Sequence, residues 1–115
     1  MTEFIYEGNQ VIPQFTTYQD NGRLALMLID AESGEMYSVV TVNLSDENIT
    51  NERCAFLDTN NNGDTITDWL EKHGFGKWTG GFGFSGFCIY PEFVFNQDVI
   101  DQYKLQPVPE LFEEV

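Results

Sequence analysis

GFGKWTGGFGFSGFCIYPEFVF, residues 74–95, is the stretch that decides the fold of this chain. It holds eight aromatic residues and six glycines. Aromatic rings bury about 150–250 Å² each, so the stretch is expected to dominate the energetics of the core. Glycine lets the backbone turn through positive φ. We therefore expect a compact glycine loop that leads into a buried strand over about residues 86–90, with Pro91 ending that strand or marking a sheet edge.

Residues 11–44 predict a three-stranded antiparallel meander. Pro13 lacks an N–H and should either confine the first strand to a sheet edge or shift its start past the proline. Asn21-Gly22 predicts a type I′ hairpin turn between the first two strands. The middle strand is apolar at nearly every position, which is typical of a central strand covered on both faces. The three strands are VIPQFTTY (11–18), RLALMLID (23–30) and MYSVVTVNL (36–44).

Residues 65–73 predict the main helix. Thr65 and Asp68 have the spacing of a capping box, in which each side chain satisfies a free amide at the helix start. Gly74 is placed to end the helix in a left-handed conformation, and Phe75 follows it for the accompanying hydrophobic contact. The apolar face of this helix, at positions i, i+3 and i+4, consists of Ile66, Trp69 and Leu70.

These patterns predict one α+β domain over residues 1–115, with one main helix packed on an antiparallel sheet. The sheet combines the N-terminal three-stranded meander with later strands, including a short one at residues 54–57. Residues 93–105 fit either a strand and a turn or a short helix, and from about residue 106 we expect a short extended tail. The predicted core consists of Leu24, Leu26, Leu28, Val40, Val42, Phe56, Ile66, Trp69, Leu70, Phe87 and Ile89.

The charge of the chain excludes several classes of partner. Five basic residues stand against 19 acidic ones, for a net charge of −14. Direct binding to a nucleic acid or to an anionic membrane needs a basic surface, so we expect neither. An unknown protein partner with a basic surface fits this charge, although acidity also simply keeps a protein soluble. The sequence lacks an 18-residue apolar run and a signal peptide, so we expect a cytoplasmic protein that is a monomer or a weak dimer.

The polar run at residues 58–63 resembles the start of a calcium-binding loop. Asp58, Asn60, Asn62 and Gly63 match the opening D-x-[DN]-x-[DN]-G, but the bidentate glutamate six residues after the glycine is replaced by Trp69. Calcium needs six to eight oxygen ligands, so this loss is serious. We interpret the run as a turn rich in Asx residues that leads to the helix, and we expect no metal site and no cofactor.

The remaining motifs do not predict catalysis either. Residues 81–86 follow G-x-G-x-x-G literally, but a glycine loop precedes them and a strand follows, which is the wrong context for a dinucleotide. His73 is interpreted as a helix C-terminal residue, and Cys54 and Cys88 as small buried hydrophobic residues. We therefore predict no enzyme. A hydrolase site near Asp58 and Ser85 is the alternative. It would require a deep cleft that holds Asp58, Asn60 and Ser85, with strongly shifted carboxylate pKa values.

The order of these segments resembles a family of small uncharacterised bacterial proteins, found mainly in gut Firmicutes and Bacteroidetes and often on conjugative elements and plasmids. The similarity runs over about residues 22–95, through NGRLALMLID, GEMYSVVTVNL, CAFLDTNNN, HGFGKWTG and SGFCIYPEFVF. It implies a cytoplasmic accessory protein of mobile DNA, with no activity to carry over. The matching residues are Gly22, Leu24, Tyr37, Thr41, Asn43, Leu44, Asp58, Asn60, Gly74, Gly76, Gly80, Ser85, Gly86, Tyr90 and Pro91.

Two functions remain open at this stage. The first is a small acidic accessory protein that acts as a non-enzymatic protein-interaction module. The second is a DNA mimic that inhibits a host nuclease or another DNA-binding protein by occupying its basic groove. Mimicry requires acids to gather on one elongated face, and the candidates are Asp30, Glu32, Glu35, Asp46, Glu47 and Glu52.

Overall fold

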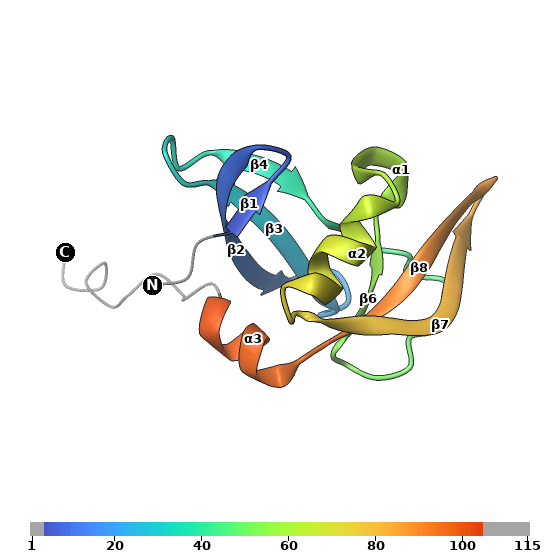
Figure 1. Ribbon diagram of the computed structural model, residues 1–115. Helices are drawn as coiled ribbons and strands as arrows, with labels where there is room; N and C mark the ends of the chain where they lie inside the picture. Colours follow the sequence, from blue (N-terminus) through green and yellow to red (C-terminus); the bar gives the residue numbers. More distant parts are fainter. Residues whose placement is uncertain (1–3, 105–115) are drawn as a thin grey trace, which may run out of the picture.

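The computed structural model describes residues 4–104, which form two four-stranded antiparallel sheets and three helices (Figure 1). The first sheet has the order β1-β2-β3-β4 and the second has the order β5-β6-β8-β7. The strands are β1 (Phe4–Tyr6), β2 (Asn9–Thr17), β3 (Leu24–Asp30), β4 (Met36–Val39), β5 (Thr41–Val42), β6 (Cys54–Leu57), β7 (Gly76–Ser85) and β8 (Cys88–Phe95).

The helices are α1 (Thr59–Asn62), α2 (Thr65–Lys72) and α3 (Gln97–Tyr103). The antiparallel α+β architecture therefore agrees with the sequence, although strands predominate. The prediction of one sheet with one main helix is not confirmed, because the strands divide into two sheets and α1 and α3 accompany α2. The open choice over residues 93–105 is settled as the end of β8 followed by α3, and the tail expected from residue 106 lies outside the described residues.

The meander is confirmed in β2, β3 and β4, but its third strand is shorter than predicted. The run 36–44 divides at Val40, which is fully buried, and continues as β5 in the other sheet. The Val40 amide donates to the Leu26 carbonyl on β3 at 2.9 Å, and its carbonyl accepts from the Asp58 amide at 2.7 Å. One residue thus joins the two sheets through both of its backbone polar groups.

The edge placement predicted for Pro13 and Pro91 is wrong, since β2 and β8 are interior strands. Strand β2 does not start past Pro13 either, since it begins at Asn9 and Pro13 pairs with Leu28 inside it. Pro91 lies just beyond the end of a neighbouring ladder, because the pairs of β6 with β8 end at Glu92. The missing N–H of Pro91 therefore removes no ladder bond on that side.

The predicted two-residue turn at Asn21-Gly22 is also wrong in type. Residues 18–23 form a longer loop, in which the Gly22 amide donates to the Tyr18 carbonyl at 2.7 Å. Gly22 has the expected positive φ of 73°, whereas Asn21 does not have a positive φ. The Asn21 side chain instead accepts from the Arg23 amide at 3.1 Å and donates to Asn43 at 3.0 Å.

Helix α2 ends as the sequence predicts. Gly74 has φ +78°, its amide donates to the Glu71 carbonyl at 3.1 Å, and the Phe75 amide donates to the Leu70 carbonyl at 3.0 Å. These two bonds define a Schellman motif. The predicted capping box is wrong, because the N-cap is Asp64 and no side chain caps the helix start.

The largest core cluster draws on both sheets and on α2. Its fully buried side chains include Phe15, Leu26, Leu28, Phe75 and Phe95. Most of the predicted core is confirmed, although Val42 and Trp69 are only partly buried. The exceptions are Phe87 and Ile89, which are exposed. The glycine-rich stretch is not a compact loop that leads into a buried strand, but a long hairpin made of β7 and β8.

A substitution at Gly76 tests how closely β7 and β8 pack at the base of this hairpin. Its φ is +155°, and an added Cβ would lie 2.0 Å from the Val94 carbonyl oxygen, so we expect Gly76→Ala to lower the free energy of unfolding by about 2–4 kcal/mol. Gly81→Ala, on the same strand, is the control, because its Cβ would approach no atom closer than 3.4 Å. Urea denaturation of both variants measures the difference, and equal midpoints would contradict this packing.

Candidate functional site

The β7–β8 hairpin projects beyond the rest of the molecule (Figure 1). Ser85 and Cys88 are its closing pair, and Gly86 and Phe87 form the two-residue turn. Gly86 has φ +60° whereas Phe87 does not have a positive φ, which is the pattern of a type II′ turn. The glycine at 86 therefore gives the hairpin a tight tip that carries Phe87 outward.

The two faces of the hairpin are packed differently. Side chains alternate along a strand, so Gly83 and Tyr90 share one face, while Phe82, Phe84 and Ile89 share the other. The first face is covered, because Tyr90 packs with Leu44 and Phe56. A Cβ at Gly83 would lie 2.6 Å from the Phe56 ring and 2.8 Å from Leu44 Cδ1, so glycine is needed where the 43–53 loop packs.

The second face is open to solvent. Phe84 is 56% and Ile89 is 54% exposed, and Phe87 at the tip is completely exposed. Trp78 and Phe82 are exposed beside them, with ring centroids 5.3 Å apart and the Trp78 Nε1 donating to the Gly81 carbonyl at 2.9 Å. We call this surface the aromatic stripe, and it consists of Trp78, Phe82, Phe84, Phe87 and Ile89.

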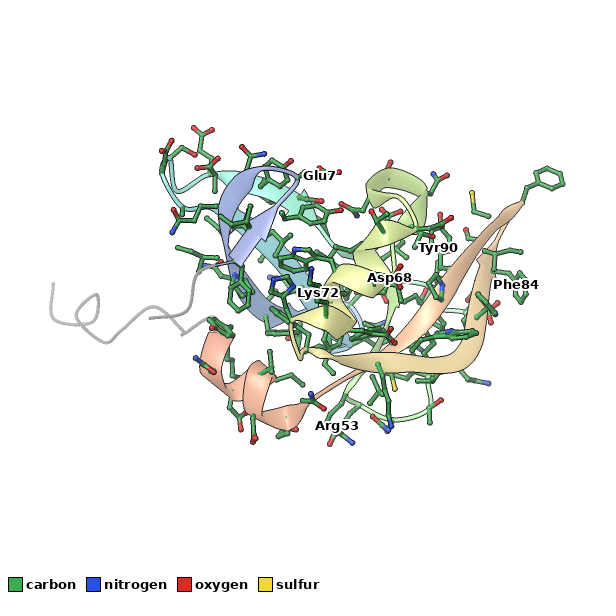
Figure 2. All side chains as sticks on the ribbon, in the orientation of Figure 1. Glu7, Arg53, Asp68, Lys72, Phe84 and Tyr90 are labelled. Carbon is green, nitrogen blue, oxygen red and sulfur yellow. The ribbon has the colours of Figure 1, made fainter. Side chains whose placement is uncertain are left out.

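The stripe continues the core rather than interrupting it. Phe93 and Phe95 follow Ile89 on the same side of β8 and are fully buried at the base of the hairpin. Toward the tip no described element covers this face, and Figure 2 shows Phe84 at the end of the molecule opposite Glu7. The strand predicted around residues 86–90 is therefore real, but this face of it is covered only at the base of the hairpin.

The stripe also lies in an uncharged segment. Residues 78–91 contain no Asp, Glu, Lys or Arg, in a chain whose net charge is −14. Interface cores are depleted in charge and enriched in aromatic residues, and contiguous exposed apolar patches mark interaction sites. The absence of charge over residues 78–91 is the feature of the sequence that points to this surface.

A second apolar surface lies on the outer face of the first sheet. Ile12, Ile29 and Met36 are neighbours across β2, β3 and β4, and Ile12 and Met36 are 47% and 57% exposed. Ile5 and Val39 are exposed on the same sheet. This surface has no exposed aromatic ring among its large apolar residues, so it is the weaker candidate and a useful control.

A buried carboxylate holds the covered face together. Glu92 is 5% exposed and accepts from the Thr50 amide at 2.7 Å, the Thr50 hydroxyl at 2.8 Å and the Thr79 hydroxyl at 2.8 Å. Burial by itself would raise the pKa of Glu92, but these hydrogen bonds, with a contribution from Cys54, lower it overall. Because its oxygens are occupied by Thr50 and Thr79, this carboxylate ties the 43–53 loop to β7 and β8.

The residues proposed for a hydrolase do not meet in a cleft. Asp58 caps α1, where it accepts from the Asn61 amide at 3.2 Å and from the Asn61 side chain at 2.7 Å. Ser85 lies at the end of β7 and lines a shallow depression of about 220 Å³ with residues 43–47. Neither Asp58 nor Asn60 belongs to the lining of that depression.

The calcium-like run and the other candidate residues have structural partners. Asn62 donates to the Val39 carbonyl at 3.0 Å and accepts from Ser38, so it faces β4. Residues 4–104 contain no group of three or more His, Cys, Asp and Glu side chains placed to hold a metal ion. His73 is the C-cap of α2, where its Nδ1 hydrogen-bonds the Trp69 carbonyl. Cys54 and Cys88 are free thiols, and Cys54 is buried as predicted whereas Cys88 is only partly buried.

The six acids considered for mimicry fall into two groups. Asp30, Glu32 and Glu35 belong to the turn between β3 and β4, where the Asp30 carboxylate accepts from the Glu32 amide at 2.8 Å. The others, Asp46, Glu47 and Glu52, belong to the loop between β5 and β6. Figure 1 shows the turn at the upper left and the loop at the lower right of the molecule.

Comparison with known proteins gives one match. A family model described as a domain of unknown function (DUF4313) matches residues 14–114. This confirms the resemblance to an uncharacterised domain family. No curated protein and no solved structure matches the chain. Within residues 4–104, no helix combines the length and the apolar character needed to cross a membrane.

Glu92→Gln should lower the free energy of unfolding by about 2 kcal/mol, because it weakens charge-assisted hydrogen bonds in a buried site. Since folding lowers the pKa of Glu92, the advantage of the wild type is complete above the ordinary carboxyl pKa of 4.5 and shrinks as the pH falls through the lowered value. Urea denaturation across this pH range measures the effect.

Glu71→Gln is the control for this experiment, because the Glu71 carboxylate accepts from the Trp78 amide in an exposed position. It should change the free energy of unfolding by less than about 0.5 kcal/mol. If Glu92→Gln were as stable as Glu71→Gln at neutral pH, the carboxylate would not hold the loop in the way described here.

Proposed function

The chain belongs to the DUF4313 family of domains of unknown function, and we propose that it is a small acidic, non-enzymatic protein-interaction module. Its docking surface is the aromatic stripe. The observation that carries this proposal is the exposure of five large apolar side chains on the uncharged residues 78–91 of one projecting hairpin. Large exposed apolar patches on a folded domain are typical of surfaces that a partner covers.

The energetics favour docking on this stripe. Burying the exposed part of each large apolar side chain would contribute about 1–2 kcal/mol at roughly 25 cal/mol per Å². Trp78 is held by Phe82 and by the Gly81 carbonyl, so its ring is already oriented and little side-chain entropy is lost on binding. Aromatic residues arranged in this way are typical of the hot spots that dominate binding energy.

The charge of the chain adds a preference for the type of partner. A net charge of −14 attracts a partner with basic residues around an apolar contact and speeds their encounter. A cytoplasmic accessory role, on a mobile genetic element, is the setting that we propose from the resemblance noted in the sequence. In this setting the partner is a protein, and the module contacts neither nucleic acid nor membrane directly.

DNA mimicry is the second candidate, and the net charge is the observation that favours it. A mimic needs its acids spaced along one face to match a phosphate backbone. The separation of Asp30, Glu32 and Glu35 from the acids of the 43–53 loop supports docking through the hairpin instead (Figure 1).

We expect the double variant Phe84→Ser, Ile89→Ser to lose at least tenfold in capture of a partner from host cells, because two exposed anchors are removed. The double variant Ile12→Ser, Met36→Ser is matched in exposure and should capture the partner like the wild type. Quantitative mass spectrometry after crosslinking in cells, followed by binding assays with the purified partner, measures both.

Salt separates the two candidate functions. Docking on the stripe should survive a rise from about 50 to 200 mM salt, whereas mimicry should lose affinity by decades over that range. A partner that the Phe84→Ser, Ile89→Ser variant retains, and that is lost with salt, would refute docking through the stripe and support mimicry.

A further inference from the structure

Strand β7 forms one edge of the second sheet. It pairs with β8 on one side, and ten residues make it the longest described strand. In a hairpin closed by Ser85 and Cys88, hydrogen-bonded and non-hydrogen-bonded pairs alternate. Phe82 and Phe84 fall in the non-hydrogen-bonded pairs, so their N–H and C=O groups point away from β8. No hydrogen bond within the described part of the chain joins these groups to another segment.

The outer half of this edge lacks the usual protection against pairing. Sheet edges are normally blunted by charges, prolines or bulges. Strand β7 has one charge, Lys77, and one register shift, between Trp78 and Phe82. Both of these protecting features lie toward the base of the hairpin. Residues 82–85 have neither a charge nor a proline, and their register with β8 is regular.

We propose that this edge pairs with β7 of a second copy of the chain, antiparallel and about a two-fold axis at Gly83. Phe82 then lies opposite Phe84 of the second copy, and each pair exchanges two backbone hydrogen bonds, which makes four in all. The two Gly83 residues meet at the axis, where paired Cα atoms approach to about 4.5 Å. This pairing rests on the proposed function. It names a second copy of the chain as one partner of the hairpin.

Two properties of the edge favour a second copy over an unrelated strand. The contact is self-complementary, because Phe82 and Phe84 provide the donors and acceptors on both sides, as a two-fold interface requires. The paired residues themselves are also uncharged, since residues 78–91 contain no Asp, Glu, Lys or Arg. Asp46 and Glu47 line a depression with Phe84 and Ser85, so they add to the repulsion between two copies that salt screens.

The pairing changes what the aromatic stripe can bind. The rings of Phe82 and Phe84 from one copy lie beside those of the other on the same face, and such cross-strand aromatic pairs stabilise a sheet. The second sheets of two copies become one continuous sheet, and their two stripes become one surface. Stable interfaces bury about 800 Å² per partner, and a joined stripe approaches that size more closely than a single hairpin tip.

The charge of the chain gives this association a specific salt dependence. Two copies repel each other at long range, and salt screens that repulsion, with a Debye length that falls from about 30 Å at 0.01 M to about 8 Å at 0.15 M. Self-association should therefore strengthen several-fold as salt rises. Binding of a basic partner would weaken over the same change.

Sedimentation velocity of the full chain, from about 10 to about 500 μM at low and moderate salt, tests the proposal by mass action. The average mass should rise from one chain toward two, and more so at the higher salt. Phe84→Ala removes the ring alone, whereas Phe84→Pro removes the ring and the outward N–H without removing a bond to β8. Phe84→Ala should weaken the dimer several-fold, and Phe84→Pro should weaken it a further tenfold or more.

Amide exchange of the wild-type chain provides a readout that does not depend on a folded variant. The Phe82 and Phe84 amides should gain protection as concentration rises, while the Gly83 amide, bonded to β8, should be protected throughout. A single-chain mass under all conditions, equal effects of the two variants, or association that weakens with salt would each overturn the pairing. The capture experiment with the Phe84→Ser, Ile89→Ser variant would still decide whether the stripe docks another protein.

Discussion

The two hydrogen bonds of Val40 are the link on which the rest of the structure depends. Through its amide Val40 continues the pairing of the first sheet, and through its carbonyl it starts the second sheet beside Asp58. Since both polar groups are bonded, the chain crosses between sheets at a fully buried residue without an unsatisfied backbone group. This crossing lets Phe15 of the first sheet pack edge-on against Phe95 of the second, with ring centroids 5.2 Å apart.

Strands β7 and β8 of the second sheet extend beyond the core residues that pack on them. The functional proposals follow from the uncovered outer part of this hairpin. At the base of β8, Phe93 and Phe95 are buried, whereas toward the tip the same face is open. The opposite face is held firmly, because Glu92 binds Thr50 and Thr79, and because Gly83 leaves room for Leu44 and Phe56. The hairpin is thus supported from one side and presents its rings on the other.

Local features of the fold could be predicted from the sequence where neighbouring residues decide them. The Schellman end of α2 at Gly74 is one such feature, because only glycine readily adopts the positive φ that this stop requires. The interior position of β3 is another, since a long apolar run is typical of a central strand, although Met27 and Ile29 on its outer face are only partly buried. The exposure of the aromatic stripe could not be predicted from alternation alone, because an exposed Phe84 and a buried Phe93 fit the same alternating pattern.

The sequence by itself determined the strands of the N-terminal meander, the position of α2 and the acidity of the chain, because side-chain periodicity, positive-φ glycines and charge act over a few residues. Only the tertiary structure decided that residues 36–44 divide between two sheets, and that the strands containing Pro13 and Pro91 are interior strands. It also decided that Phe87 and Ile89 face solvent. Burial depends on which distant segment covers a face, and no local pattern carries that information.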